Sequence, residues 1–175
     1  MIRNAISALA VSTLALAAPA LAATPDTGTV NITGSVGKKC KFTQASALIP
    51  LGELADADGK LNATVVNGQT ATLVAWCNAP AQVAVTANPI KASSVTAPTT
   101  QFDDRVEYTA TATIGAVAAT DGTETGATQT AGTAQNVGIF SSNVGVALSG
   151  AATTNSGLLV ADDYSGSVTV TLTPQ

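Results

Sequence analysis

The sequence predicts an all-β fold, an antiparallel β-sandwich held by one disulfide. β-branched Thr and Val are abundant, whereas charged residues make up only 10% and aromatic residues only 3% of the chain. This composition favours strands over helices. Short runs of alternating polar and apolar residues recur between turn residues, and no segment keeps a helical period over a useful length. Two cysteines, Cys40 and Cys77, complete the case.

The first residues predict a secretory signal peptide over positions 1–22. Arg3 supplies a short positive region, residues 5–18 are apolar or small, and Ala20-Leu21-Ala22 fits a cleavage site. The apolar run is too short for a membrane span. We therefore expect an exported mature chain that starts near Ala23 and does not insert directly into a membrane.

Net charge argues against binding to nucleic acid. Without Arg3, six basic residues remain beside eleven acidic ones, which gives the mature chain a net charge of −5. A chain with so few Lys and Arg is a poor candidate for binding nucleic acid or an anionic membrane. The sequence therefore predicts no nucleic-acid partner.

The cysteine count predicts a disulfide. In an exported chain, two cysteines allow a single pairing, Cys40 with Cys77. A metal or redox pair would need a Cys-x-x-Cys spacing or a histidine partner, and the sequence has neither. In the chain-entropy model, closing a loop of this size is worth about 3–4 kcal/mol.

Alternation predicts the positions of the strands. The turn at Asn78-Ala79-Pro80 predicts either a hairpin or a corner between two sheets. Residues 88–104, which hold two prolines, are expected to form a long connection, and residues 115–135, rich in Gly, Ala and Thr, a mobile loop. The expected strands are residues 29–36, 69–77, 82–87, 105–114, 137–140, 144–148 and 164–173.

The residues needed for catalysis are missing. The chain has no histidine, the usual general base and the commonest metal ligand. The Asp103/Asp104 and Asp162/Asp163 pairs and the Asp56–Gly59 turn lack the further ligands of a calcium site and are expected to be solvated turns. We therefore expect no enzyme activity, no cofactor and no metal.

The strand count predicts an incomplete sandwich. An immunoglobulin-type sandwich needs about seven strands, and about six follow Cys40 before the sequence ends on its last strand. That strand would border an open apolar groove. An additional alternating strand, residues 29–36, precedes the disulfide-linked domain and has no obvious partner. A surplus strand and a vacant groove favour completion between molecules.

Three segments resemble chaperone–usher pilins, in particular the group with spore coat protein U-like domains that includes archaic pilins. Residues 29–40 (TVNITGSVGKKC) resemble the pilin N-terminal extension, and residues 71–78 (ATLVAWCN) with 83–86 (VAVT) resemble the second cysteine region. Residues 163–172 (DYSGSVTVTL) are similar to the coat-type ending. Gly166 stands where that ending has its second aspartate, and Pro174 where pilins commonly have an aromatic residue.

The resemblance implies a subunit of a surface fimbria, or pilus, that polymerises by donor-strand exchange. It implies residues 1–22 as signal peptide, 23–39 as donor extension and 40–175 as the pilin domain. Copies of itself or other pilins, a periplasmic chaperone and an outer-membrane usher would be the partners. The donor strand would present Val30, Ile32, Gly34 and Val36, of which Gly34 is the small position; the acceptor groove beside the last strand would present Val168, Val170 and Leu172.

Other interpretations stay open. Residues 29–36 could form an ordinary first strand within their own domain, giving a self-complemented secreted or coat-type protein that does not polymerise. A ligand-binding face is a further possibility, because Thr109, Thr111 and Thr113 form a row on one strand. Such a row on a single strand is more typical of the solvent face of a sandwich.

Overall fold

The structure is a computed structural model that describes residues 23–126 and 128–175. The predicted signal peptide therefore lies outside the described residues. The chain divides into two units, residues 1–35 and residues 36–175, and each is described by itself. Residues 36–175 are called the body below. The boundary expected after Lys39 stays a prediction.

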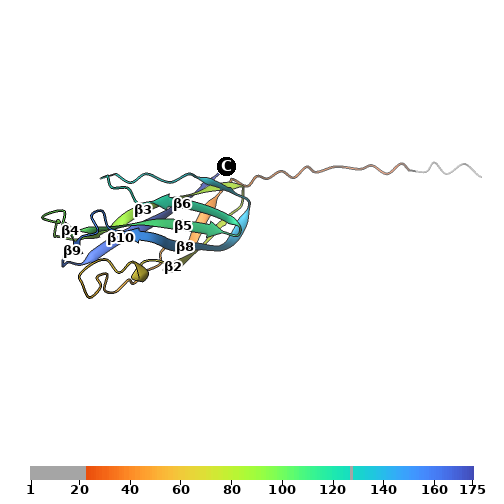
Figure 1. Ribbon diagram of the computed structural model, residues 1–175. Coiled ribbons are helices and arrows are strands. Elements are labelled where there is room, and N and C mark those ends of the chain that lie inside the picture. The colour runs from red at the N-terminus through yellow and green to blue at the C-terminus, as the bar shows by residue number, and fades with distance from the viewer. Residues whose placement is uncertain (1–22, 127) are drawn as a thin grey trace, which may run out of the picture. The chain divides into compact units, whose positions relative to one another are not determined.

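The body is all-β, as the sequence predicts (Figure 1). In the part of the chain that the structure describes, the only helical element is a single 3₁₀ turn, and no helix is long and apolar enough to cross a bilayer. The elements are β1 (Cys40–Gln44), η1 (Ala63–Val65), β2 (Thr70–Cys77), β3 (Ala81–Ala92), β4 (Phe102–Asp103), β5 (Arg105–Ile114), β6 (Val117–Gly122), β7 (Gln135–Val137), β8 (Phe140–Ala152), β9 (Leu158–Leu159) and β10 (Tyr164–Pro174).

Eight strands form one antiparallel sheet that is nearly closed into a barrel-like shape. The strand order is β1-β2-β8-β5-β3-β10, with β6 paired to β5 and β7 paired to β3. The short strands β4 and β9 form a separate parallel pair. The first and last strands of the body, β1 and β10, therefore stand at the two ends of the main sheet order, each paired on one side only.

The predicted disulfide is confirmed. Cys40 and Cys77 are bonded and lie directly opposite each other in the β1–β2 ladder. The bond fixes the edge strand β1 to its single neighbour.

The core follows the alternation of the sequence. On β5, residues at even positions from Val106 to Ile114 are buried, whereas Thr109, Thr111 and Thr113 face outward. On β3, Ala81, Val83, Val85 and Ala87 are buried in alternation, and Pro89 and Ile90 beyond them are buried as well. Most core side chains are therefore small or β-branched, which suits closely spaced β-layers.

Several strand predictions are confirmed. β2 and β10 match the predicted segments within one residue at each end, and β5 matches its segment at both ends. β2 and β3 do not pair with each other, so the turn at residues 78–80 is a corner and not a hairpin.

Two predicted connections are wrong. β3 continues through Pro89 to Ala92, and β4 lies inside the expected long connection, residues 88–104. Residues 115–135 were expected to form a mobile loop, but they contain β6, which pairs with β5 from Val117 to Gly122. Asp103 also departs from its prediction as a solvated turn residue: its side chain is 2% exposed and accepts hydrogen bonds from Asn155 and the amide of Gly157.

The segment before β1 forms no strand, although residues 29–36 were predicted to form one. A strand exists only beside another strand, because its backbone groups need partners. The large apolar side chains in this segment, Val30, Ile32 and Val36, are all exposed.

Candidate functional site

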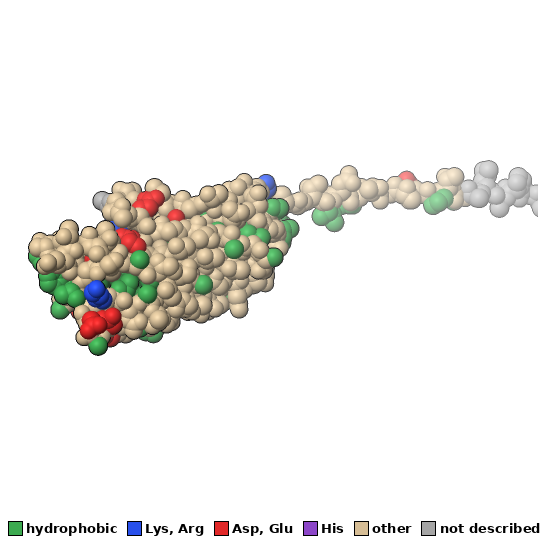
Figure 2. All heavy atoms as spheres, viewed as in Figure 1, with side chains coloured by type: hydrophobic (Ala, Val, Ile, Leu, Met, Phe, Trp, Pro, Cys, Tyr) green, Lys and Arg blue, Asp and Glu red, His purple; other side chains and the backbone are tan. Residues whose placement is uncertain are grey.

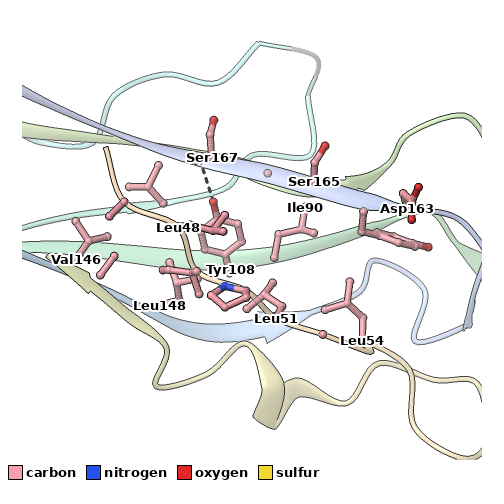
Figure 3. Close-up of a pocket in the computed structure, with 18 of the residues that line it drawn as sticks. Leu48, Leu51, Leu54, Ile90, Tyr108, Val146, Leu148, Asp163, Ser165 and Ser167 are labelled. Carbon is pink, nitrogen blue, oxygen red and sulfur yellow. Dashed lines mark hydrogen bonds between the residues drawn. The ribbon is translucent and has the colours of Figure 1, made fainter. Parts of the chain in front are cut away.

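The body contains one large apolar cleft, with a volume of about 1120 Å³ (Figure 3). One wall is the beginning of β10 with the residues before it, 159–163, and the other is the segment that follows β1, residues 45–55. Between the walls lie Ala71, Leu73, Ile90, Tyr108, Val146 and Leu148, which come from β2, β3, β5 and β8. The cleft therefore marks the place where the sheet fails to close between β1 and β10.

The β10 wall combines apolar side chains with an unpaired backbone edge. Val168, Thr169 and Val170 line the cleft; the two valines are half-buried, whereas Thr169 and Thr171 are exposed. Leu172, the third predicted groove residue, packs against the core but does not line the cleft. β10 pairs with β3 alone, so every second residue of β10 turns its N–H and C=O groups away from the ladder.

The opposite wall is irregular. β1 ends at Gln44 after a bulge at residues 42–44, and residues 45–50 form no strand. Leu48 lines the cleft and is nevertheless 85% exposed. Burying an exposed leucine is worth about 1.5–3 kcal/mol, so this wall has apolar surface left for an occupant.

Tyr108 joins β3 to β10 from within the cleft. Its hydroxyl lies 2.7 Å from the carbonyl oxygen of Asn88 and 3.0 Å from that of Ser167, and it shares its single proton between them (Figure 3). Burial, followed by the charges of Asp121 and Glu107, raises the pKa of Tyr108 to about 12. The neutral hydroxyl therefore holds the beginning of β10 in place. Sequence reasoning placed Tyr108 on a strand but assigned it no role.

Gly166 occupies a bulge in the β10–β3 ladder, between Ser165 and Ser167. A Cβ atom there would lie 3.0 Å from the Cα and Cγ1 atoms of Ile90 and from the carbonyl oxygen of Pro89. A larger residue at this position would therefore crowd β3. The bulge also sets the direction of β10 along the cleft.

The predicted donor residues lie outside the strands of the described chain. Val30, Ile32 and Val36 are 86%, 93% and 88% exposed, and no atom lies within 4 Å of where a Cβ of Gly34 would be. The alternating apolar row is therefore available along residues 30–36.

Asn78 fixes the chain directly after this row. Its side-chain oxygen accepts a hydrogen bond from the amide of Lys39 at 2.6 Å, and its side-chain amide donates to the carbonyl oxygen of Gly37 at 2.9 Å. Its own backbone amide donates to the carbonyl oxygen of Lys39 at 3.0 Å. From Gly37 onward the chain is held by its own body, so Val36 is the last residue of the row without such an anchor.

The carboxylates at the start of β10 organise loops. Asp162 accepts hydrogen bonds from the amides of Ser94, Val95 and Asp163, and the pKa of Asp162 is lowered to about 2, chiefly by the first two amides. Among residues 23–126 and 128–175, no group of three or more His, Cys, Asp or Glu side chains could hold a metal ion. What the site offers is non-covalent: an apolar trough beside an unpaired strand edge.

This arrangement suits an extended segment that adds a strand and inserts alternate side chains. Comparison of the chain with protein-family models, curated proteins and solved structures found no match.

Proposed function

We propose that this protein is a structural subunit of a surface fimbria and that it polymerises by donor-strand exchange. Residues 29–36 of one copy enter the cleft between β10 and residues 45–55 of another copy. Val30, Ile32 and Val36 then fill the cleft, and Gly34 passes its narrowest contact.

The observation that carries the proposal is the open apolar cleft beside the unpaired edge of β10. An exposed strand edge is a template for pairing, and the cleft beside it offers space for the alternate side chains of an added strand. An inserted strand satisfies both features, because its backbone pairs with β10 while its alternate side chains are buried.

The extension has the composition that such a cleft accepts. Its apolar side chains, Val30, Ile32 and Val36, are two and four residues apart, and an even spacing points them all to one face of a strand. Burying Val30, Ile32 and Val36 is worth about 5–9 kcal/mol before the cost of ordering the segment. Residues 30–36 span about 20 Å when extended. That length matches the seven residues of β10 that line the cleft, Tyr164 to Val170.

The resemblance to chaperone–usher pilins adds the remaining parts of the proposal. The chain is exported, a periplasmic chaperone covers the cleft before assembly, and an outer-membrane usher builds the fibre. No enzymatic step, cofactor or nucleic acid is involved, and the chain does not insert directly into the membrane.

A pair of glycine variants tests the proposal. Gly34→Phe places a large side chain in the middle of the donor row, where it competes for space with Ile32 and Val36 and blocks insertion of the row into the cleft. Gly28→Phe adds the same side chain to the same extension before the row begins, and both positions are free of neighbours within 4 Å. We expect the exported Gly34→Phe chain to stay monomeric while the wild type and Gly28→Phe form multimers, as measured by size-exclusion chromatography with light scattering.

Deletion of residues 23–36 gives an independent measurement. This deletion keeps Gly37 and Lys39, and with them the hydrogen bonds to Asn78. Loss of multimers supports the proposal. Multimers of unchanged size after the deletion, or a wild type that is a stable monomer with no partner, would refute it; the latter result would favour a self-complemented secreted domain.

A further inference from the structure

Charges are distributed unevenly along the body. Three lysines lie close together at the beginning of the body: Lys38 and Lys39 directly before β1, and Lys41 on β1. Glu53, Asp162 and Asp163 line the cleft at the start of β10. Figure 3 shows Asp163 at the same end of the cleft as Leu54, the neighbour of Glu53. On the face shown in Figure 2, the acidic side chains lie toward one end of the body with a basic side chain beside them, and another basic side chain lies at the opposite end.

The basic cluster lies at the far end of β10. Pro174 pairs with Ala81, and the amide of Gln175 donates to the carbonyl oxygen of Pro80. Asn78, two residues before Pro80, accepts a hydrogen bond from the backbone amide of Lys39. The two ends of β10 therefore carry opposite charge: acidic where the strand begins and basic where it ends.

These charges are not neutralised by ion pairs within the body. Among the described residues, the only ion pair joins Arg105 to Glu107. Lys60 and Lys91 lie on neighbouring segments but do not line the cleft. The low pKa of Asp162, about 2, keeps its carboxylate charged at any physiological pH.

The hydrogen bonds to Asn78 begin at Gly37, directly after the donor row. When the donor row of one copy is inserted into the cleft of a second copy, the body of the first copy therefore lies at one end of that cleft. If the row runs antiparallel to β10, Lys38 and Lys39 arrive at the acidic start of β10. If it runs parallel, they arrive beside the lysines of the receiving copy, where like charges repel. In the antiparallel case, placing Ile32 opposite Val170 brings Lys39 close to Asp163, because Lys39 lies seven residues after Ile32 and Asp163 lies seven residues before Val170.

We propose that Lys38 and Lys39 of one copy dock against Glu53, Asp162 and Asp163 of the next, forming a charged junction that orients and speeds insertion. This inference rests on the proposed function and deepens it, because it names the contact between two copies outside the cleft itself. Surface charges of opposite sign act mainly on the rate of association and on orientation.

Charge reversal on each side tests the junction in the full chain. Lys38→Glu with Lys39→Glu reverses the basic side, and Glu53→Lys with Asp163→Lys reverses the acidic side. Asp162 is left unchanged because it holds the backbone of residues 94–95. The four changes together restore both the complementarity and the wild-type net charge, so the combined variant is a matched control.

The rate of multimer growth is measured by light scattering at 20 mM and 500 mM NaCl. Each one-sided variant is expected to assemble about tenfold more slowly than wild type at low salt, which corresponds to about 1.4 kcal/mol. The difference should shrink at high salt because the charges are screened. The combined variant should recover the wild-type rate to within about threefold.

The outcomes separate this inference from the proposed function. If the wild type assembles and Gly34→Phe does not, yet the one-sided variants assemble at the wild-type rate, the junction is refuted while donor-strand exchange stands. The same holds if the combined variant is as slow as the one-sided ones while all variants keep the wild-type melting temperature. If the wild type forms no multimers, both proposals fall.

Discussion

The body has two places where its sheet could open, and it closes only one of them. β3 pairs with β5 at Ile90 and Lys91 alone and then diverges from it. β6 pairs with β5 along this divergence, and β7 pairs with β3. The gap between β1 and β10, by contrast, holds the apolar cleft.

The closed gap shows what the chain does when it completes its own sheet. The Asp121 carboxylate accepts a hydrogen bond from the amide of Ala87 at 2.7 Å, and the amide of Gly132 donates to the carbonyl oxygen of Val85 at 2.9 Å. Backbone N–H and C=O groups on the edge of β3 that do not pair with β5 are thus hydrogen-bonded to residues of the segment 117–137. No equivalent segment of the body, as far as the structure describes it, pairs with the free edge of β10. One side of the sheet is thus completed by residues of the same chain, whereas the other side keeps an unpaired strand edge beside a cleft.

The largest change in stability is expected from removal of the disulfide that links β1, beside the open side of the sheet, to β2. Replacing both Cys40 and Cys77 by Ala removes the covalent link between β1 and β2 and leaves their backbone ladder in place. We expect the free energy of unfolding to fall by about 3–4 kcal/mol, because the disulfide closes a loop in the unfolded state. Urea titration measures it, and wild type treated with a reductant should shift to the same midpoint. A loss below about 1 kcal/mol would mean that the bond constrains little.

The second-largest change in stability is expected from a substitution at Gly132, on the closed side of the sheet. At Gly132 a Cβ atom would lie 2.2 Å from the carbonyl oxygen of Thr120, so Gly132→Ala must push residues 129–134 away from β6. We expect a loss of about 2–3 kcal/mol in the free energy of unfolding.

Gly126 provides the matched control in the same connection, since nothing lies within 4 Å of where its Cβ would be. Gly126→Ala should change the stability by less than about 0.5 kcal/mol. Equal effects of the two substitutions would show that this side is not held closed by the contact at Gly132.

The smallest change in stability is expected at Tyr108, whose hydroxyl bridges β3 and β10. At pH 7, Tyr108→Phe should cost about 1 kcal/mol, because the carbonyl groups of Asn88 and Ser167 lose their shared donor. Burial raises the pKa of Tyr108 from 10 to about 12. The unfolded chain therefore releases this proton first as the pH rises, and the wild type loses stability between pH 10 and 12.

Urea titrations of the wild type and Tyr108→Phe at pH 8, 10 and 11 test this expectation. Since phenylalanine cannot ionise, the difference in stability between the two proteins should narrow above pH 10. A difference that stays constant over this range would show that the hydroxyl is not held neutral by its surroundings.

Much of the fold could be predicted because strong alternation marks the strands with two partners. β5 alternates buried residues with threonines, and its predicted bounds are those observed. The bounds of β3 were missed because Pro89 suggested a loop. In the structure Pro89 stands in the bulge opposite Gly166, where the ladder between β3 and β10 is interrupted and the missing N–H costs little.

Other features depend on contacts that no local pattern reports. β6 is short and rich in Ala and Thr, and it forms a strand because β5 offers it an edge. Asp103 stands in a pair of aspartates typical of a solvated turn, yet it is buried because Asn155 and Gly157 donate to it from a distant loop. For the candidate site, alternation identified Val168 and Val170, whereas the roles of Leu48 and Tyr108 emerge only when β1, β5 and β10 are placed together.

The most direct test of the account is a cross-link between copies. One exported chain carries Ile32→Cys, a second chain with a different tag carries Val170→Cys, and the two are co-expressed. Donor-strand exchange predicts a disulfide-linked dimer that carries both tags, and it predicts that adding Gly34→Phe to the first chain abolishes the dimer. Multimers that form without this link, or a single chain carrying both cysteines that bridges only to itself, would contradict the account.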